Sequence, residues 1–172
     1  MMRSSNGRGP GDQRGERTVG HAVNIRTAAI DDATSLAALA GELGYPTTTE
    51  QMQIRLGTAA AESQHRVFIA ELDAIAGWIQ VSLMLSLETG QFAEIVGLVV
   101  AESERGAGIG GKLVAAAEKW AAEEGCTRIR VRTNVLREKA RLFYQRLGYQ
   151  GVKRQEVFDK ALTEGGPAGN AG

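Results

Sequence analysis

Four glycines within six residues mark the stretch of this chain that could bind an anion. They lie between positions 106 and 111, after an apolar and largely β-branched run over residues 95–100 and at the start of a helical pattern. Glycines leave backbone N–H groups open to a ligand, and a helix N-terminus carries roughly half a positive charge. Arg105 adds a full charge. A strand, a glycine turn, a helix and an arginine together predict a site for phosphate or pyrophosphate.

Two familiar glycine motifs fit this stretch only in part. A dinucleotide-binding fold places the turn directly after its strand and an acid at the end of the next strand. Here polar residues intervene, and the acids at a suitable distance, Glu123 and Glu124, stand at a helix end. The nucleotide P-loop needs a hydroxyl where this chain has Leu113. A turn without any ligand is also disfavoured, because glycines at a helix start cost stability.

The composition bounds the class of protein. The 172 residues suffice for one domain with a core. A formal net charge of zero gives no electrostatic reason to expect nucleic acid or an anionic membrane as partner. No apolar run is long enough to span a membrane. The single cysteine, Cys126, fits a reducing cytoplasm, and two histidines argue against a histidine-rich metal site, so no metal is expected.

The elements that would position the glycine turn follow from hydrophobic periodicity. We expect one folded domain over residues 22–162, between a disordered leader at 1–21 and a disordered tail at 163–172. The expected strands are 22–27, 65–72, 76–87, 94–100 and 127–133, the expected helices 30–43, 49–61, 109–124 and 136–147, and one or two closing strands are expected in 149–162. The strand–helix–strand unit around the turn implies one parallel pair, so the fold class is a mixed α/β sheet.

Two motifs give the chain a resemblance to a known family. Arg105, Gly108 and Gly110 satisfy [RQ]-x-x-G-x-[GA], which resembles the pyrophosphate loop of the GNAT superfamily of N-acetyltransferases. Residues 132–149, R-T-N-V-L-R-E-K-A-R-L-F-Y-Q-R-L-G-Y, are similar to the family's last helix, N…A-x-x-[FL]-Y-x-x-x-G-[FY]. The resemblance covers residues 23–162. It implies a central, mostly antiparallel sheet with one parallel pair, flanked by about four helices.

The resemblance implies acetyl-CoA as co-substrate and assigns roles to residues. The backbone of Leu98, Val99 and Val100 would pair with the pantetheine arm like an added strand. The pyrophosphate would be held by the turn, which comprises Arg105, Gly106, Ala107, Gly108, Ile109, Gly110 and Gly111. Tyr144 would protonate the departing thiolate; the alternative is that Tyr144 is a core residue on an inward helix face.

Two further roles stay open between alternatives. Direct attack by an amine needs a base for the ammonium proton, and Glu94, at the start of the central strand, is either that base or a simple strand-start charge. Family members often place an Asn seven residues before the Tyr, where this chain has Arg137. Asn134 lies ten residues before it and could instead cap the helix. Asn134 and Arg137 are therefore both candidates for a cofactor contact.

The predicted function is acetyl-CoA-dependent acetylation of a primary amine in the cytoplasm. The pattern N-V-x-R-x-x-A-x-x-F-Y-x-x-x-G-Y is similar to small-molecule members such as aminoalkylphosphonate and aminoglycoside acetyltransferases, so a small-molecule amine is the expected partner. A protein N-terminal or lysine acceptor and a non-catalytic acyl-CoA sensor are the alternatives. The shape of the groove near Tyr45 and Glu88 would separate them. The family has many dimeric members, which leaves a homodimer open.

Overall fold

The computed structural model describes residues 22–134 and 136–162. The expected leader and tail, residues 1–21 and 163–172, lie outside the described residues. The chain divides after Arg132 into two compact units, here called unit one, up to that residue, and unit two, from Thr133 onward. No helix of the described ranges is both long enough and apolar enough to cross a bilayer.

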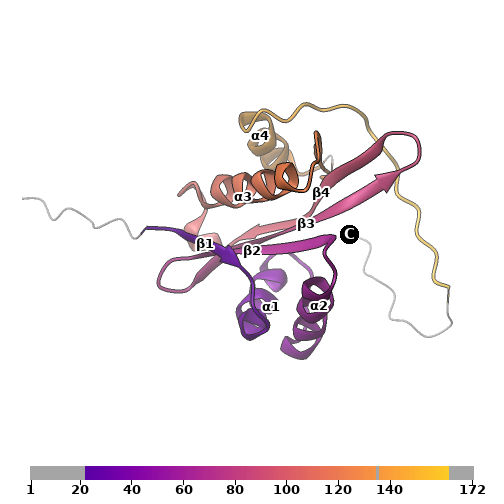
Figure 1. Cartoon of the computed structure of the whole chain (residues 1–172). Helices are drawn as coiled ribbons and strands as arrows, with labels where there is room; N and C mark the ends of the chain where they lie inside the picture. The colour runs from indigo at the N-terminus through magenta and orange to yellow at the C-terminus, as the bar shows by residue number, and fades with distance from the viewer. Residues whose placement is uncertain (1–21, 135, 163–172) are drawn as a thin grey trace, which may run out of the picture. The chain divides into compact units, whose positions relative to one another are not determined.

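Unit one is built on a five-stranded mixed sheet in the order β1-β2-β3-β4-β5 (Figure 1). The strands are β1 (Asn24–Thr27), β2 (His65–Glu71), β3 (Ile75–Ser86), β4 (Gly90–Val100) and β5 (Ile129–Val131). The first four pair antiparallel, whereas β5 runs parallel to β4. The predicted mixed sheet with one parallel pair is confirmed, and β5 is shorter than the 127–133 that its alternation indicated.

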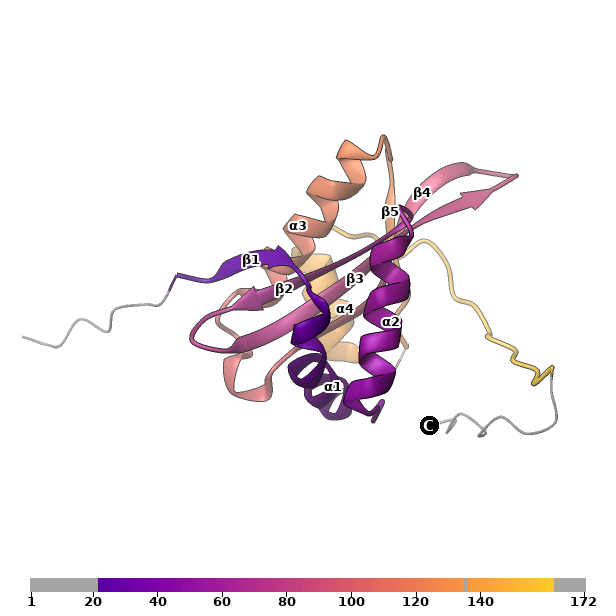
Figure 2. The ribbon, with the colours of Figure 1, turned by 60° about the horizontal axis from the view of Figure 1, so that its bottom comes forward.

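Helices cover both faces of this sheet (Figures 1 and 2). They are α1 (Ala33–Glu42), entered through a 3-10 turn at Ile30–Asp32, α2 (Thr49–Ala61) and α3 (Ile109–Glu123). The first two lie on one face and α3 lies on the other. Helix α2 starts where its sequence predicts, because Thr48 and Gln51 form a reciprocal capping box.

Each face of the sheet carries its own apolar layer. On the α1 and α2 face the buried cluster consists of Ala33, Leu36, Ala37, Ala40, Met52, Leu56 and Ile69. On the opposite face α3 buries Ile109, Leu113, Val114, Ala117, Trp120 and Ala121. Gly77 of β3 allows β4 and helix α3 to approach closely, since a Cβ there would lie 2.6 Å from the Val99 carbonyl oxygen and 3.3 Å from Leu113.

Unit two contains helix α4 (Glu138–Arg146) followed by residues without regular structure. Gly148, with a φ of 92°, takes the left-handed conformation that ends such a helix. The expectation of closing strands in 149–162 is wrong, since none of these residues forms a strand. The segment has no period-two pattern, and its apolar side chains Val152, Val157 and Phe158 are 81%, 85% and 88% exposed. A strand is stabilised by burying one alternating face, which this segment does not do.

An arginine on β1 ties the first strand to the first helix and to β2. Arg26 donates two hydrogen bonds to the Asp32 carboxylate, at 2.7 and 2.9 Å, and its Nε donates to Glu71 at 3.2 Å. Asp32 is buried and also accepts from the Ala29 backbone N–H at 2.7 Å. The hydrogen bonds from Arg26 hold the pKa of Asp32 below its ordinary value. The carboxylate therefore stabilises the fold only while it is ionised.

Asp32→Asn should lower the free energy of unfolding by about 2 kcal/mol at neutral pH, since it removes charge-assisted hydrogen bonds. Because the pKa of Asp32 is lowered by folding, this stabilisation is present above the ordinary Asp pKa and is lost as the pH falls through the lowered value. The difference between variant and wild type should thus shrink in acid. Urea unfolding at several pH values measures it, with the exposed neighbour change Asp31→Asn as control. An equal loss in both variants would contradict the assignment.

Candidate functional site

The glycine turn adopts the conformation that its sequence predicts. Gly106 and Gly108 have φ angles of 92° and 80°, and Gly108 is the N-cap of α3. Both angles lie in the left-handed region that only glycine adopts at little cost. The first N–H groups of the 15-residue helix α3 have no partner within the helix. The turn thus presents open N–H groups at the positive end of a helix, which suits an anion.

Strand β4, which leads into this turn, has an edge that is only partly paired. It pairs with β3 along its length, but β5 pairs only with Ala93, Glu94 and Ile95. From residue 97 to residue 100 the β5 side of β4 has no strand partner in the described part of unit one. Leu98 and Val100 therefore turn their backbone groups to this open side, whereas Val99 turns its own toward β3.

A bulge marks the point where β4 loses β5. Gln80 of β3 faces Gly97, whereas its neighbour Val81 faces Ile95, so Val96 is an extra residue without a partner on β3. Such a bulge bends a strand and raises its local twist. Beyond the turn of η2 (Glu102–Glu104), Arg105 returns to this strand and donates from Nε to the Val100 carbonyl at 3.1 Å. The bulge, the unpaired edge and the glycine turn are consecutive.

Glu94 is a carboxylate with one paired and one unpaired oxygen. Its side chain is 13% exposed, and its Oε1 accepts from the Nε of Arg132 at 3.1 Å. Its Oε2 is buried and has no hydrogen-bond partner among the described residues. An unpaired buried acceptor costs free energy.

Glu94 lies next to a row of polar residues that crosses the sheet. Its partner in register is Ser82 of β3, which in turn pairs with His65 of β2. Directly opposed residues point to the same face. Ser82 Oγ lies 2.8 Å from Nδ1 of His65, and Nε2 of His65 lies 3.0 Å from a carboxylate oxygen of Glu62. Sequence reasoning missed this row, because its members come from separate segments and only the register brings them together.

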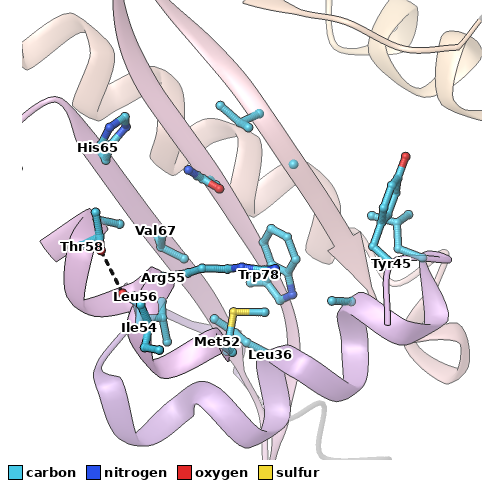
Figure 3. A pocket seen from close by; sticks show the side chains of 16 residues that line it. Leu36, Tyr45, Met52, Ile54, Arg55, Leu56, Thr58, His65, Val67 and Trp78 are labelled. Carbon is cyan, nitrogen blue, oxygen red and sulfur yellow. Dashed lines mark hydrogen bonds between the residues drawn. The ribbon is translucent and has the colours of Figure 1, made fainter. Parts of the chain in front are cut away.

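A pocket opens on the face of the sheet that carries this row. It has a volume of about 590 Å³ and lies between α1, α2 and strands β2 to β4 (Figure 3). Its lining consists of Leu36, Ala40, Leu43, Tyr45, Met52, Ile54, Arg55, Leu56, Thr58, Ala59, His65, Val67, Trp78, Gln80, Val96 and Gly97. Gly97 leaves space for the Trp78 ring in the wall of the pocket, since a Cβ there would lie 3.0 Å from that ring. Tyr45 lies at the pocket, as the sequence suggested, and Glu88 does not line it.

The remaining candidates belong to unit two. Tyr144 is buried and packs edge-to-face on Phe143 and Tyr149, with ring centroids 5.0 and 5.4 Å apart. Burial raises the pKa of Tyr144 to about 12, so its phenol keeps its proton at neutral pH. The side-chain oxygen of Asn134 accepts from the Leu136 N–H at 2.9 Å in a turn before α4. Arg137 is the exposed N-cap residue of α4.

The fold and these motifs agree with a comparison against protein families. The family described as acetyltransferase (GNAT) matches residues 31–149, which is more than half of the chain. The chain therefore belongs to the GNAT acetyltransferase family. Members of this family use acetyl-CoA. A comparison with curated proteins found no match.

Solved structures share the same fold. A transcriptional regulator from Bacillus halodurans C-125 is 25% identical with a TM-score of 0.73, over 81% of this chain and 100% of that one. AAC(6')-Iy, solved with the bisubstrate analogue CoA-S-monomethyl-acetylneamine, is 19% identical with a TM-score of 0.74, over 81% and 99%. An aminoglycoside 6'-N-acetyltransferase from Acinetobacter baumannii is 20% identical with a TM-score of 0.73, over 83% and 100%. At 19% and 20% identity these likenesses establish the fold alone.

The glycine turn makes a prediction about stability that two matched substitutions can test. Gly108→Ala should destabilise the protein by about 1 kcal/mol, since a left-handed φ is costly for alanine although no atom blocks its Cβ. Gly57→Ala in α2 meets open space too, but its helical backbone suits alanine, so it should stabilise by about 0.5 kcal/mol. Thermal unfolding of both variants measures this. Effects of the same sign would contradict the conformation described for the turn.

Proposed function

We propose that this protein transfers the acetyl group of acetyl-CoA to a primary amine of a small molecule, by direct attack of the amine on the thioester. The observation that carries the proposal is the unpaired edge of β4, which is followed after the short η2 turn by the glycine turn. A ligand with an extended arm that leads to a pyrophosphate matches both the strand edge and the glycine turn. Membership of the GNAT family supports the same co-substrate.

The binding roles follow from the chemistry of each part. The backbone of Leu98 and Val100 would hydrogen-bond the pantetheine arm as an added strand holds a sheet edge. The N–H groups of residues 106–111 and the start of α3 would hold the pyrophosphate. Arg105 would contribute its charge from the same turn, although its Nε is used on Val100. Asn134 and Arg137 both stay candidates for a further contact.

Glu94 and Tyr144 would handle the two protons of the reaction. When bound, acetyl-CoA supplies an activated acyl thioester. The ammonium first gives one proton to a base; attack then forms the C–N bond and breaks the C–S bond, and a second proton passes on balance from the nitrogen to the thiolate. Glu94 would take the first at its unpaired oxygen, directly or through water. Tyr144, which keeps its proton at neutral pH, would supply the second.

The pocket between α1, α2 and the sheet would hold the acceptor. It lies on the face shared by Glu94, Ser82 and His65, and its volume is that of a small-molecule site. The solved neighbours include aminoglycoside acetyltransferases, which act on small-molecule amines, and this favours a small acceptor over a protein. A cytoplasmic location and a homodimer stay predictions.

The proposed function is tested by CoA release from acetyl-CoA in the presence of primary amines, with the acetylated product identified by mass spectrometry. Glu94→Gln keeps the shape of the side chain but removes its basicity, so kcat should fall about 10²-fold or more. Glu124→Gln, an exposed change at the end of α3, is the matched control and should leave kcat unchanged. Wild-type CoA release without any amine product, or an unchanged kcat in Glu94→Gln, would contradict the assigned chemistry.

Tyr144→Phe should lower kcat by about 10²-fold and leave the Kd for acetyl-CoA nearly unchanged, since only the phenol proton is lost. The phenylalanine ring preserves the packing on Phe143 and Tyr149. Tyr149→Phe removes a hydroxyl from the neighbouring ring and serves as control. Turnover kinetics together with calorimetry separate the two effects. A weaker Kd with an unchanged kcat would make Tyr144 a binding or structural residue.

A further inference from the structure

The interior of the pocket between α1, α2 and the sheet is apolar. Its walls include Leu36, Met52, Leu56, Val67 and Trp78. The first three belong to the buried cluster of this face, and the last two pack against that cluster. A ligand rich in hydroxyl and ammonium groups would lose hydration against these walls, and the lining has no carboxylate to pair with its ammonium groups. The body of a well-matched ligand is therefore aliphatic or aromatic.

The charge at this pocket is positive. Arg55 is exposed, and Figure 3 shows its side chain extending from α2 in the direction of Trp78. It forms no ion pair with any residue in the described ranges, and no Asp or Glu lines the pocket. Glu62, the acid that contacts the lining residue His65, is paired with it at 3.0 Å. A free guanidinium is suited to an anionic oxygen group, which it can bind with two parallel hydrogen bonds.

Trp78 contributes its ring to the wall of the pocket and not its N–H. The indole Nε1 is buried and has no hydrogen-bond partner among the described residues. Because this atom is closed to solvent, a ligand in the pocket would contact the apolar ring and not the donor. Arg55 is therefore the charged donor of the lining.

We infer that the acceptor is an amine whose apolar body carries a negatively charged oxygen group, and that Arg55 binds this group. The inference rests on the proposed function, because it names the acceptor class of that reaction. The amine would extend toward Glu94, on the same face of the sheet, while the anionic end stays at the pocket mouth. Polycationic acceptors such as aminoglycosides would be repelled by Arg55 and would find no carboxylate in the lining.

The kinetic test compares two amines that differ by one carboxylate, benzylamine and 4-(aminomethyl)benzoate, with kanamycin as a polycation. For the wild type, kcat/KM should be about tenfold or more higher for the carboxylate, as expected for a charge-assisted hydrogen bond. Arg55→Ala should abolish this preference and Arg55→Glu should reverse it. Lys119→Ala removes a positive charge from α3 on the opposite face and should leave the ratio unchanged. A preference for benzylamine or kanamycin in the wild type would overturn the inference while supporting acetyl transfer.

A binding measurement separates this inference from the proposed function. The chain has two tryptophans, so Trp120→Phe leaves Trp78 in the pocket as the single indole reporter. Titration with 4-(aminomethyl)benzoate should change its emission, and Arg55→Ala should weaken the apparent Kd about tenfold. Such binding without any acetylation would support the pocket assignment and reject the proposed function. Equal binding of benzylamine, or no binding of either amine, would overturn the inference. If Trp120→Phe does not fold, the wild-type kinetics provide the test.

Discussion

The incomplete pairing of β4 is the constraint on which the rest of this structure depends. Parallel β5 pairs in register with β4 over Ala93, Glu94 and Ile95, and the bulge at Val96 follows at once. Beyond it the strand keeps one side of its backbone open and ends in a turn that glycine conformations redirect into α3. A sheet edge that ends at the positive pole of a helix is a binding site for an extended ligand with an anionic end.

The other face of the sheet gains its properties from the same strand. Because Glu94 stands just before the bulge, its register partners are Ser82 and, one strand further, His65. Because Gly97 stands just after it, the Trp78 ring can lie against β4 and form a wall of the pocket. The carboxylate with an unpaired oxygen and the apolar pocket thus occupy one face. In the proposed function, this shared placement would bring the acceptor amine to the carboxylate of Glu94.

Much of the fold of unit one follows from the sequence, because its signals are local. The capping residues Thr48 and Gln51 delimit α2, whose predicted range matches the structure, and the glycine turn opens α3 where expected. The closing strands were predicted wrongly in 149–162, since β-branched residues without alternation bury no face. At the candidate site, the strand β4 and the glycine turn were predictable for the same reason. The row of Glu62, His65 and Ser82 depends on register and packing, and so does the place of Arg55 at the pocket. No local sequence pattern reports either of them.

The central claim is that the open edge of β4 and the glycine turn form one site for acetyl-CoA. Isothermal titration calorimetry of the protein with acetyl-CoA, and with ATP and NAD as controls, tests it most directly. The structure predicts saturable binding of acetyl-CoA and none of the two controls, because only acetyl-CoA joins an amide-bearing arm to a pyrophosphate. Failure to bind acetyl-CoA, or preferential binding of ATP or NAD, would contradict the account of the turn and of the chemistry built on it.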